Sequence, residues 1–92
     1  MAEGQDIELI QQCLQGNSKS FECIVDKYQL PIYNIALRML NDADEAEDIT
    51  QIVFIKAFEN LQQFNTKYKL FSWLYRIAIN ESLNLQHSRR RA

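Results

Sequence analysis

Aromatic and basic side chains alternate over one short stretch in the second half of the chain, residues 64–76. The members are Phe64, Lys67, Tyr68, Lys69, Phe71, Trp73, Tyr75 and Arg76. Unpaired bases stack on aromatic rings and cations between the rings hold the phosphate backbone, so this composition suits single-stranded nucleic acid better than a duplex. Aromatic residues also dominate ordinary cores, and several of these rings are expected to be buried instead.

A line of polar side chains continues from this stretch. Arg76, Asn80 and Asn84 are spaced four residues apart, which places them on one face of a helix. A side-chain amide can hydrogen-bond a base edge in two places, and arginine can bind a phosphate or a guanine. The sequence therefore predicts a face that contacts nucleic acid, although Asn84 could equally be a solvated surface residue.

Residue types that would support catalysis or hold a cofactor form no recognisable pattern. There is no paired nucleophile and base, and no phosphate-binding loop of the G-x-x-x-x-G-K-[ST] type. Cys13 and Cys23 lie ten residues apart with His87 far from both, and both fall at apolar positions of helical patterns, so we predict buried thiols. We expect no enzyme, no catalytic residue, no metal and no cofactor.

The formal charge is divided along the chain. Residues 1–66 carry four basic and eleven acidic side chains, whereas 67–92 carry six basic and one acidic, which gives −7 and +5. Such a split predicts two different partners, with nucleic acid confined to the C-terminal third. For the run Arg89, Arg90 and Arg91, a solvated basic tail is the alternative.

Length and composition favour a single helical domain. Ninety-two residues suffice for one core, and two glycines, one proline and 47% apolar residues favour packed helices. No apolar run approaches the roughly 18 residues of a membrane span, and the acidic N-terminus lacks the features of a secretory signal. We expect a cytoplasmic protein with no membrane contact.

Periodicity and helix-end signals predict an all-α bundle of three to four helices. The expected helices cover residues 6–15, 18–40, 42–63 and 71–87, followed by a basic linker at 88–92. Gly16 should end the first helix and Pro31 should bend the second. Asp42 should cap the third, with Glu45 reaching back. Residues 64–70 form the expected loop, in which Asn65 and Thr66 favour a turn.

The third predicted helix has more apolar surface than one core contact requires. Its buried stripe consists of Ala46, Ile49, Val53, Ala57 and Leu61. Ile52, Phe54 and Ile55 lie on other faces, which indicates a second contact. The alternative is that a bundle buries a wide arc of this helix.

Several runs together resemble region 2 of bacterial sigma factors, most closely the extracytoplasmic-function (ECF) group. They are DEAEDITQ at 44–51, VFIKAF at 53–58 and FSWLYRIAIN at 71–80, with Phe64 between them. The segments 16–22 and 28–33 are also similar to the opening of that domain. The resemblance covers nearly the whole chain, and the spacing of the runs makes it specific.

The resemblance implies a polymerase-binding face on the third helix. In this family the helix docks on the clamp helices of the largest RNA polymerase subunit, which implies Asp48, Gln51, Ile52, Phe54 and Ile55 as contacts here. The family usually has Glu directly after the Gln, where this chain has Ile52. One polar contact is therefore expected to be missing or replaced. An anti-sigma protein is a further possible partner, and we expect a monomer.

The resemblance also implies that the loop and the fourth helix melt and read the minus-ten promoter element. A flipped base of the single non-template strand would be held by the loop, without ATP hydrolysis. Trp73 and Arg76 would support the junction, Asn80 and Asn84 would approach adjacent bases, and Arg89, Arg90 and Arg91 would meet phosphates. The loop residues implied are Asn65, Thr66, Lys67, Tyr68 and Lys69. The helix-turn-helix domain of the family, which reads the minus-thirty-five element, is not in this sequence, and we expect one domain that ends in the linker.

Two other functions stay open at this point. A general single-strand-binding or duplex-reading module would share the aromatic and basic stretch, but it would not need the third helix with its apolar surface. A structural or interaction bundle, bound only by an anti-sigma partner, would explain that surface without DNA.

Overall fold

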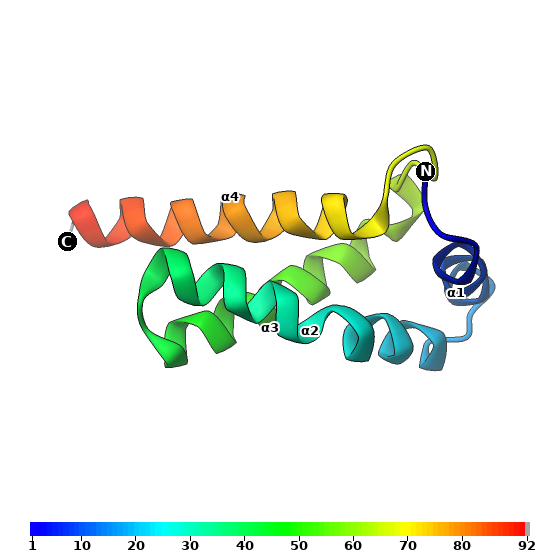
Figure 1. The fold of residues 1–92 in the computed structure, drawn as a ribbon, viewed down its shortest axis with the longest axis horizontal. Coiled ribbons are helices and arrows are strands. Elements are labelled where there is room, and N and C mark those ends of the chain that lie inside the picture. Colours follow the sequence, from blue (N-terminus) through cyan, green and yellow to red (C-terminus); the bar gives the residue numbers. More distant parts are fainter. Residues whose placement is uncertain (92) are drawn as a thin grey trace.

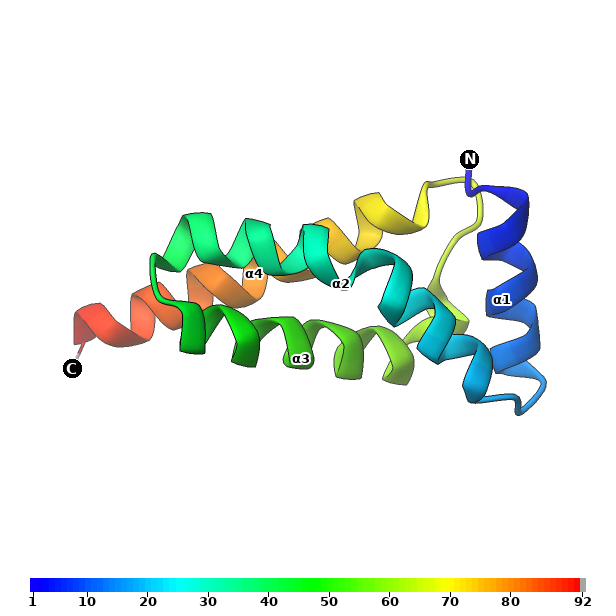
Figure 2. The same ribbon diagram turned by 60° about the horizontal axis from the view of Figure 1, so that its bottom comes forward.

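The computed structural model describes residues 1–91, apart from the side chains of Arg90 and Arg91. The elements are α1 (Gly4–Leu14), α2 (Lys19–Leu40), α3 (Ala43–Glu59), a short 3-10 helix η1 (Leu61–Gln63) and α4 (Leu70–Arg91). α2, α3 and α4 run along the long axis of the molecule and α1 lies across one end (Figures 1 and 2). The predicted all-α class is confirmed, and the described residues contain no strand.

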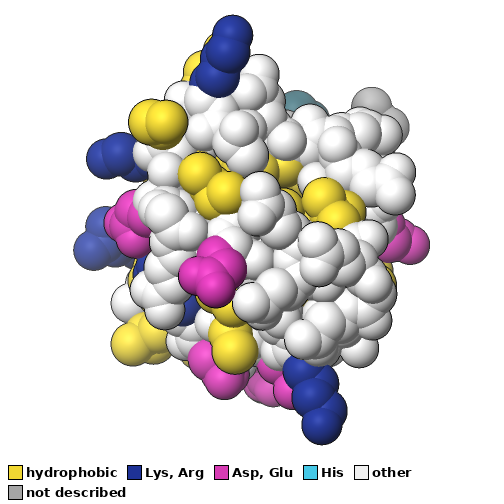
Figure 3. Space-filling model, turned by 90° about the vertical axis from the view of Figure 1, so that its right-hand side faces the viewer, with side chains coloured by type: hydrophobic (Ala, Val, Ile, Leu, Met, Phe, Trp, Pro, Cys, Tyr) yellow, Lys and Arg dark blue, Asp and Glu magenta, His cyan; other side chains and the backbone are white. Residues whose placement is uncertain are grey.

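The bundle is elongated, with extents of 42 × 21 × 19 Å. α2 and α3 are antiparallel and joined by a tight turn, and α4 then runs back in the direction of α2 (Figure 1). Seen from the α1 end, exposed hydrophobic side chains lie among scattered charges of both signs (Figure 3). No described helix is long and apolar enough to cross a membrane.

Backbone geometry ends α1 and α2 within one residue of the predicted positions. Gly16 has a φ of 103°, a conformation in which glycine is favoured, and its N–H donates to Cys13 O at 3.0 Å. Asn41 has a φ of 53° and closes α2 by donating its N–H to Leu37 O at 2.8 Å. α2 also changes direction part-way along (Figure 2), as expected with Pro31 inside it.

Only one of the two hydrogen bonds of the predicted capping box is present at the start of α3. Asp42 Oδ1 accepts from Glu45 N at 3.0 Å, so the expected cap is present. Glu45 does not reach back, because its carboxylate accepts from Arg89 Nε at 2.9 Å. The reciprocal half of the capping box is therefore replaced by a contact between α3 and α4.

The ends of α3 and α4 differ from the prediction. α3 stops at Glu59 rather than continuing to residue 63, because Asn60 caps it by donating its side-chain amide to Lys56 O at 2.8 Å. α4 extends to Arg91, so residues 88–91, which were predicted to lie beyond the helix, are helical. Gln86 Nε2 donates to Met39 O at 2.6 Å, and together with the Arg89 contact this holds the last turns of α4 against the turn between α2 and α3.

The core follows the predicted stripes closely. Ala46, Ile49, Val53, Ala57 and Leu61 are each at most 4% exposed, as the third-helix pattern predicted. Small residues occur on all three long helices, where Ala36, Ala57 and Ala78 have no exposed surface. Because helix separation depends on the side chains at the contact, these residues let the helices approach closely. The prediction of two buried thiols is wrong for Cys23, which is exposed, whereas Cys13 is half-buried and burial raises the pKa of its thiol.

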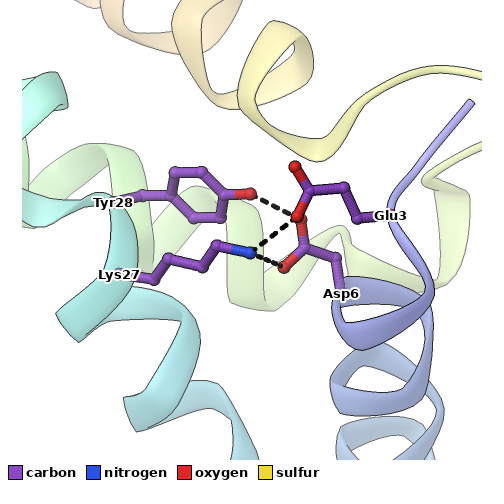
Figure 4. Close-up of polar contacts among 4 residues, drawn as sticks. All are labelled: Glu3, Asp6, Lys27 and Tyr28. Carbon is purple, nitrogen blue, oxygen red and sulfur yellow. Dashed lines mark hydrogen bonds and ion pairs between the residues drawn. The ribbon is translucent and has the colours of Figure 1, made fainter.

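A polar cluster fixes α1 to α2, and the sequence pattern did not reveal it. Asp6 is 1% exposed, and its carboxylate accepts from Lys27 Nζ at 3.0 Å and from Tyr28 OH at 2.5 Å (Figure 4). Glu3 accepts a further bond from Lys27 at 3.0 Å. Hydrogen bonds to Asp6 and then Glu3 raise the pKa of Lys27. Burial, followed by the bond to Asp6, raises the pKa of Tyr28 to about 12.

The N-terminus also supports the loop before α4. Ala2 is 6% exposed, and its N–H donates to Thr66 O at 3.0 Å. Because Asp6 anchors α1 to α2, this bond ties the loop to the body of the bundle. Two segments more than sixty residues apart in sequence are thus held together.

Candidate functional site

The loop between η1 and α4 has a defined conformation. Asn65 Oδ1 accepts from Lys67 N at 2.9 Å, and Asn65 O accepts from Tyr68 N at 3.0 Å. These bonds form an Asx turn inside a β-turn. Phe64 and Leu70 are buried at the two ends, with 9% and 1% of their surface exposed. The loop is therefore anchored at both ends and braced in the middle.

A cavity of about 350 Å³ opens beside this loop, and we call it the loop cavity. It is lined by Gln63, Phe64, Asn65, Tyr68, Ser72, Trp73 and Arg76. The rings of Phe64 and Trp73 are in contact, with centroids 5.2 Å apart. The volume lies in the range of sites that hold small ligands. Aromatic rings, an arginine and side-chain amides together suit a planar polar group carrying a phosphate.

A second depression adjoins the loop cavity along α4. It is lined by Lys56, Asn60, Gln63, Trp73, Ile77, Asn80 and Glu81. Gln63 and Trp73 line both hollows, so the two are neighbours on one surface. Lys56 and Glu81 form an ion pair across it, from α3 to α4. Asn80 therefore belongs to the same surface as the loop.

The structure brings together some of the predicted DNA contacts and separates others. Asn65, Tyr68, Trp73 and Arg76 line the loop cavity, and Asn80 lines the adjoining depression. Thr66, Lys67, Lys69 and Asn84 are exposed but line neither hollow. The Arg89 guanidinium is bound to Glu45 in the structure, and its contact with a phosphate stays a prediction. The predicted contacts of Arg90 and Arg91 fall on side chains outside the described part of the chain.

Sequence reasoning missed two cavity-lining residues, Gln63 and Ser72. Ser72 lies four residues before Arg76, so it extends the polar line through Asn80 by one turn, and helical spacing could have found it. Gln63 was assigned to the end of a continuous helix. Its place in the cavity depends on η1, which no pattern in the sequence indicated.

The predicted polymerase contacts on α3 share one exposed face with one exception. Ile52 and Ile55 are 37% and 58% exposed, and Asp48 and Gln51 are exposed beside them. Phe54 is only 6% exposed, and its ring meets Phe21 edge-on at 6.4 Å. Phe54 was expected on an outer face, but it belongs to the core because α2 covers the flank of α3 on which it lies.

This face continues into a groove between α2 and α3. Its lining from α2 consists of Val25, Asp26, Gln29, Leu30 and Tyr33. Its lining from α3 consists of Glu47, Thr50, Gln51, Phe54 and Ile55. Leu30 is 67% exposed, so α2 adds apolar surface that the sequence reasoning had not assigned. The groove shares no lining residue with the loop cavity, and the molecule thus has two separate candidate surfaces.

The sequence of this chain also matches the model of a known protein family. The model of sigma-70 region 2 matches residues 24–92. The chain belongs to the sigma-70 region 2 family. The predicted resemblance to sigma factors is confirmed, and the bundle is a region 2 domain.

Similar proteins include ECF sigma factors. The domain is 43% identical over 75 residues to the ECF RNA polymerase sigma factor SigW of Bacillus subtilis, covering 82% of this chain and 40% of that protein. It is 38% identical over 84 residues to the RNA polymerase sigma-H factor of Pseudomonas aeruginosa, covering 91% and 44%. The chain thus spans less than half the length of these relatives. A solved structure of an engineered region 2 of sigmaE in complex with GTAAAA is 30% identical, with a TM-score of 0.85 over 97% of this chain and 92% of that one.

Proposed function

We propose that this region 2 domain acts in transcription initiation as part of an ECF sigma factor. One surface, α3 with its groove toward α2, docks on the clamp helices of the largest RNA polymerase subunit. The other surface, the loop cavity and the depression beside it, captures a flipped base from the non-template strand of the minus-ten promoter element. The observation that carries this proposal is the loop cavity, in which contacting aromatic rings, two amide side chains and Arg76 meet beside a braced loop.

Capture can melt DNA without an external energy source if binding offsets the cost of unstacking. Flipping a base costs a few kcal/mol, and stacking on an aromatic ring returns about 1–3 kcal/mol per base. The ordered loop reduces the entropy lost on binding, because its hydrogen bonds form without DNA. The binding of GTAAAA by the engineered sigmaE region 2 supports a single-stranded ligand for this domain as well.

Binding of a single strand is measurable through Trp73, since it is the only tryptophan of the chain and lines both hollows. We expect GTAAAA-type strands to quench its fluorescence. Asn80→Ala should weaken this binding by about fivefold to tenfold, because one contact to a base is worth roughly 1–1.4 kcal/mol. Asn34→Ala, an exposed change on α2, is the matched control. Equal affinities of the two variants for the strand would show that Asn80 does not contact the DNA.

Docking on the polymerase is tested with the isolated clamp-helix fragment. Gln51→Ala combined with Ile55→Ala should weaken binding at least tenfold, or about 1.4 kcal/mol, because both side chains are exposed on the α3 face and line the groove. The matched control is Gln11→Ala with Leu14→Ala, which removes the same polar and apolar types from the exposed side of α1. Failure of the parent domain to bind would contradict the docking proposal. Binding by the parent with an equal loss in both double variants would place the docking surface elsewhere.

A further inference from the structure

We infer that the loop cavity selects a base that presents two adjacent hydrogen-bond acceptors. Cytosine offers N3 and O2 on its pairing edge, and guanine offers O6 and N7 on its major-groove edge. The inference rests on the proposed function, since it requires a base in the cavity. It is drawn from the orientation of one amide and from the chemistry of the other lining groups.

The bond from Lys67 N holds the Asn65 amide in one orientation, with its NH₂ end directed away from that bond. Its Oδ1 accepts from Lys67 N at 2.9 Å, and a backbone N–H can be accepted only by the amide oxygen, so the assignment of oxygen and nitrogen is determined by chemistry. The NH₂ group is left for a ligand, and Asn65 lines the cavity. The β-turn bond from Tyr68 N to Asn65 O and the bond from Ala2 N to Thr66 O hold this orientation before a ligand arrives.

Two other side chains that line the cavity can donate hydrogen bonds but cannot accept them. Arg76 has five N–H donors and no acceptor, and the indole of Trp73 is a donor only. Gln63, Tyr68 and Ser72 can donate or accept, and no carboxylate lines the cavity. Among the described residues, no carboxylate forms an ion pair with Arg76, so its donors are available. A ligand therefore meets fixed donors and adaptable groups.

The four bases differ in how well they match fixed donors. Thymine places an N3–H donor between its two carbonyl oxygens, and adenine places its amino group beside N1 and N7. Each would leave at least one cavity donor without a partner or facing another donor, which weakens binding. We expect the preferred base to bind about tenfold more tightly than thymine at the same position, which corresponds to about 1.4 kcal/mol.

The experiment begins by locating the captured position in the strand. Each nucleotide of GTAAAA is replaced in turn by an abasic unit, and affinity for the whole 92-residue chain is measured by Trp73 fluorescence and confirmed by NMR titration. The sensitive position then receives each natural base. It also receives pyrimidin-2-one, which keeps N3 and O2 but lacks the amino group of cytosine, and 7-deazaguanine, which lacks N7. Retained binding of pyrimidin-2-one identifies the cytosine mode, and loss with 7-deazaguanine identifies the guanine mode.

A variant separates base selection from general affinity. Asn65→Asp keeps the acceptor for Lys67 N–H, so the turn is preserved, but it replaces the cavity donor with an acceptor. The preference for cytosine or guanine over thymine should fall from about tenfold to about none. Asn84→Asp adds the same charge on α4 outside the cavity, and there the preference should remain while overall affinity falls. Circular dichroism verifies that both variants are folded.

The outcomes distinguish the inference from the function on which it rests. If abasic replacement weakens binding at one position but all four bases bind there equally, or thymine or adenine binds best, the selection rule is wrong and base capture stands. If no strand binds at about 1 mM, or no position is sensitive to base removal, base capture itself fails and the selection rule falls with it.

Discussion

At the scale of single residues, Asp6 shows how a buried charge can organise a small domain. Among the described residues it is the acidic side chain most completely removed from solvent, and a carboxylate in that position needs hydrogen-bond donors from its neighbours. Lys27 and Tyr28 supply them from α2. The cluster attaches α1 to α2. Because Ala2 lies next to α1 and bonds to Thr66, the cluster also supports the loop beside the loop cavity.

The cluster predicts a loss of stability at alkaline pH. Tyr28 has a pKa of about 12 in the folded protein, above its ordinary value of about 10, so its contribution to the free energy of unfolding is complete below pH 10 and is lost as pH rises toward 12. The pKa of Lys27 is also raised, and its contribution is lost in the same direction. We expect urea unfolding to show a decline in stability between pH 10 and 12.

Tyr28→Phe tests the origin of this decline. The variant should be less stable at pH 8 by about 1.5–3 kcal/mol, because Asp6 loses a hydrogen bond to its charge, and it should lose less stability above pH 10. Tyr68→Phe is the matched control, since Tyr68 is 64% exposed. Stability profiles for Tyr28→Phe and the parent that run parallel from pH 8 to 12 would contradict the assignment.

At the scale of elements, the end of α1 and the start of α3 were easier to predict than the C-terminal extension of α4. Asp42 and Gly16 act through backbone groups within a few residues, so local sequence is sufficient to identify them. The continuation of α4 beyond His87 depends on Gln86 and Arg89 finding partners on Met39 and Glu45, more than forty residues away. A basic run that looked like a linker therefore became part of a helix.

We expect the Asp42 cap on α3 to contribute measurably to the free energy of unfolding. Asp42→Ala removes the acceptor of the Glu45 N–H and should cost about 1 kcal/mol in urea unfolding. Asp42→Asn is the matched control, because it keeps the acceptor and removes only the charge, and it should cost less than half as much. An equal cost for both variants would mean that the charge near the helix dipole, rather than the hydrogen bond, is responsible.

At the scale of the whole molecule, the bundle separates its two candidate surfaces. The groove lies between α2 and α3, whereas the loop cavity lies between η1, the loop and the start of α4, and they share no lining residue. α3 nevertheless contributes to both regions, with Gln51 and Ile55 toward the groove and Lys56 toward the depression beside the cavity. One helix therefore fixes the distance between the two candidate surfaces.

This separation predicts independent effects of changes on the two surfaces. The Gln51→Ala, Ile55→Ala variant should bind single strands within about twofold of the parent, and Asn80→Ala should bind the clamp-helix fragment within the same margin, since separated sites with no shared partners usually give additive free energies. A triple variant completes the cycle. A coupling above about 0.5 kcal/mol between the two surfaces would show that α3 transmits a change from one to the other.

The sequence by itself determined the helical class, the buried stripe of α3, the cap at Asp42 and the family to which the domain belongs. Each of these depends on spacing within one helix or on runs of neighbouring residues. The tertiary structure alone decided that Phe54 lies in the core, that Arg89 pairs with Glu45, that Asp6 is buried and that Gln63 joins Ser72 in the loop cavity. These outcomes depend on which helix covers which flank, and a periodic pattern records only that a side chain can be buried or paired, not the residue it meets.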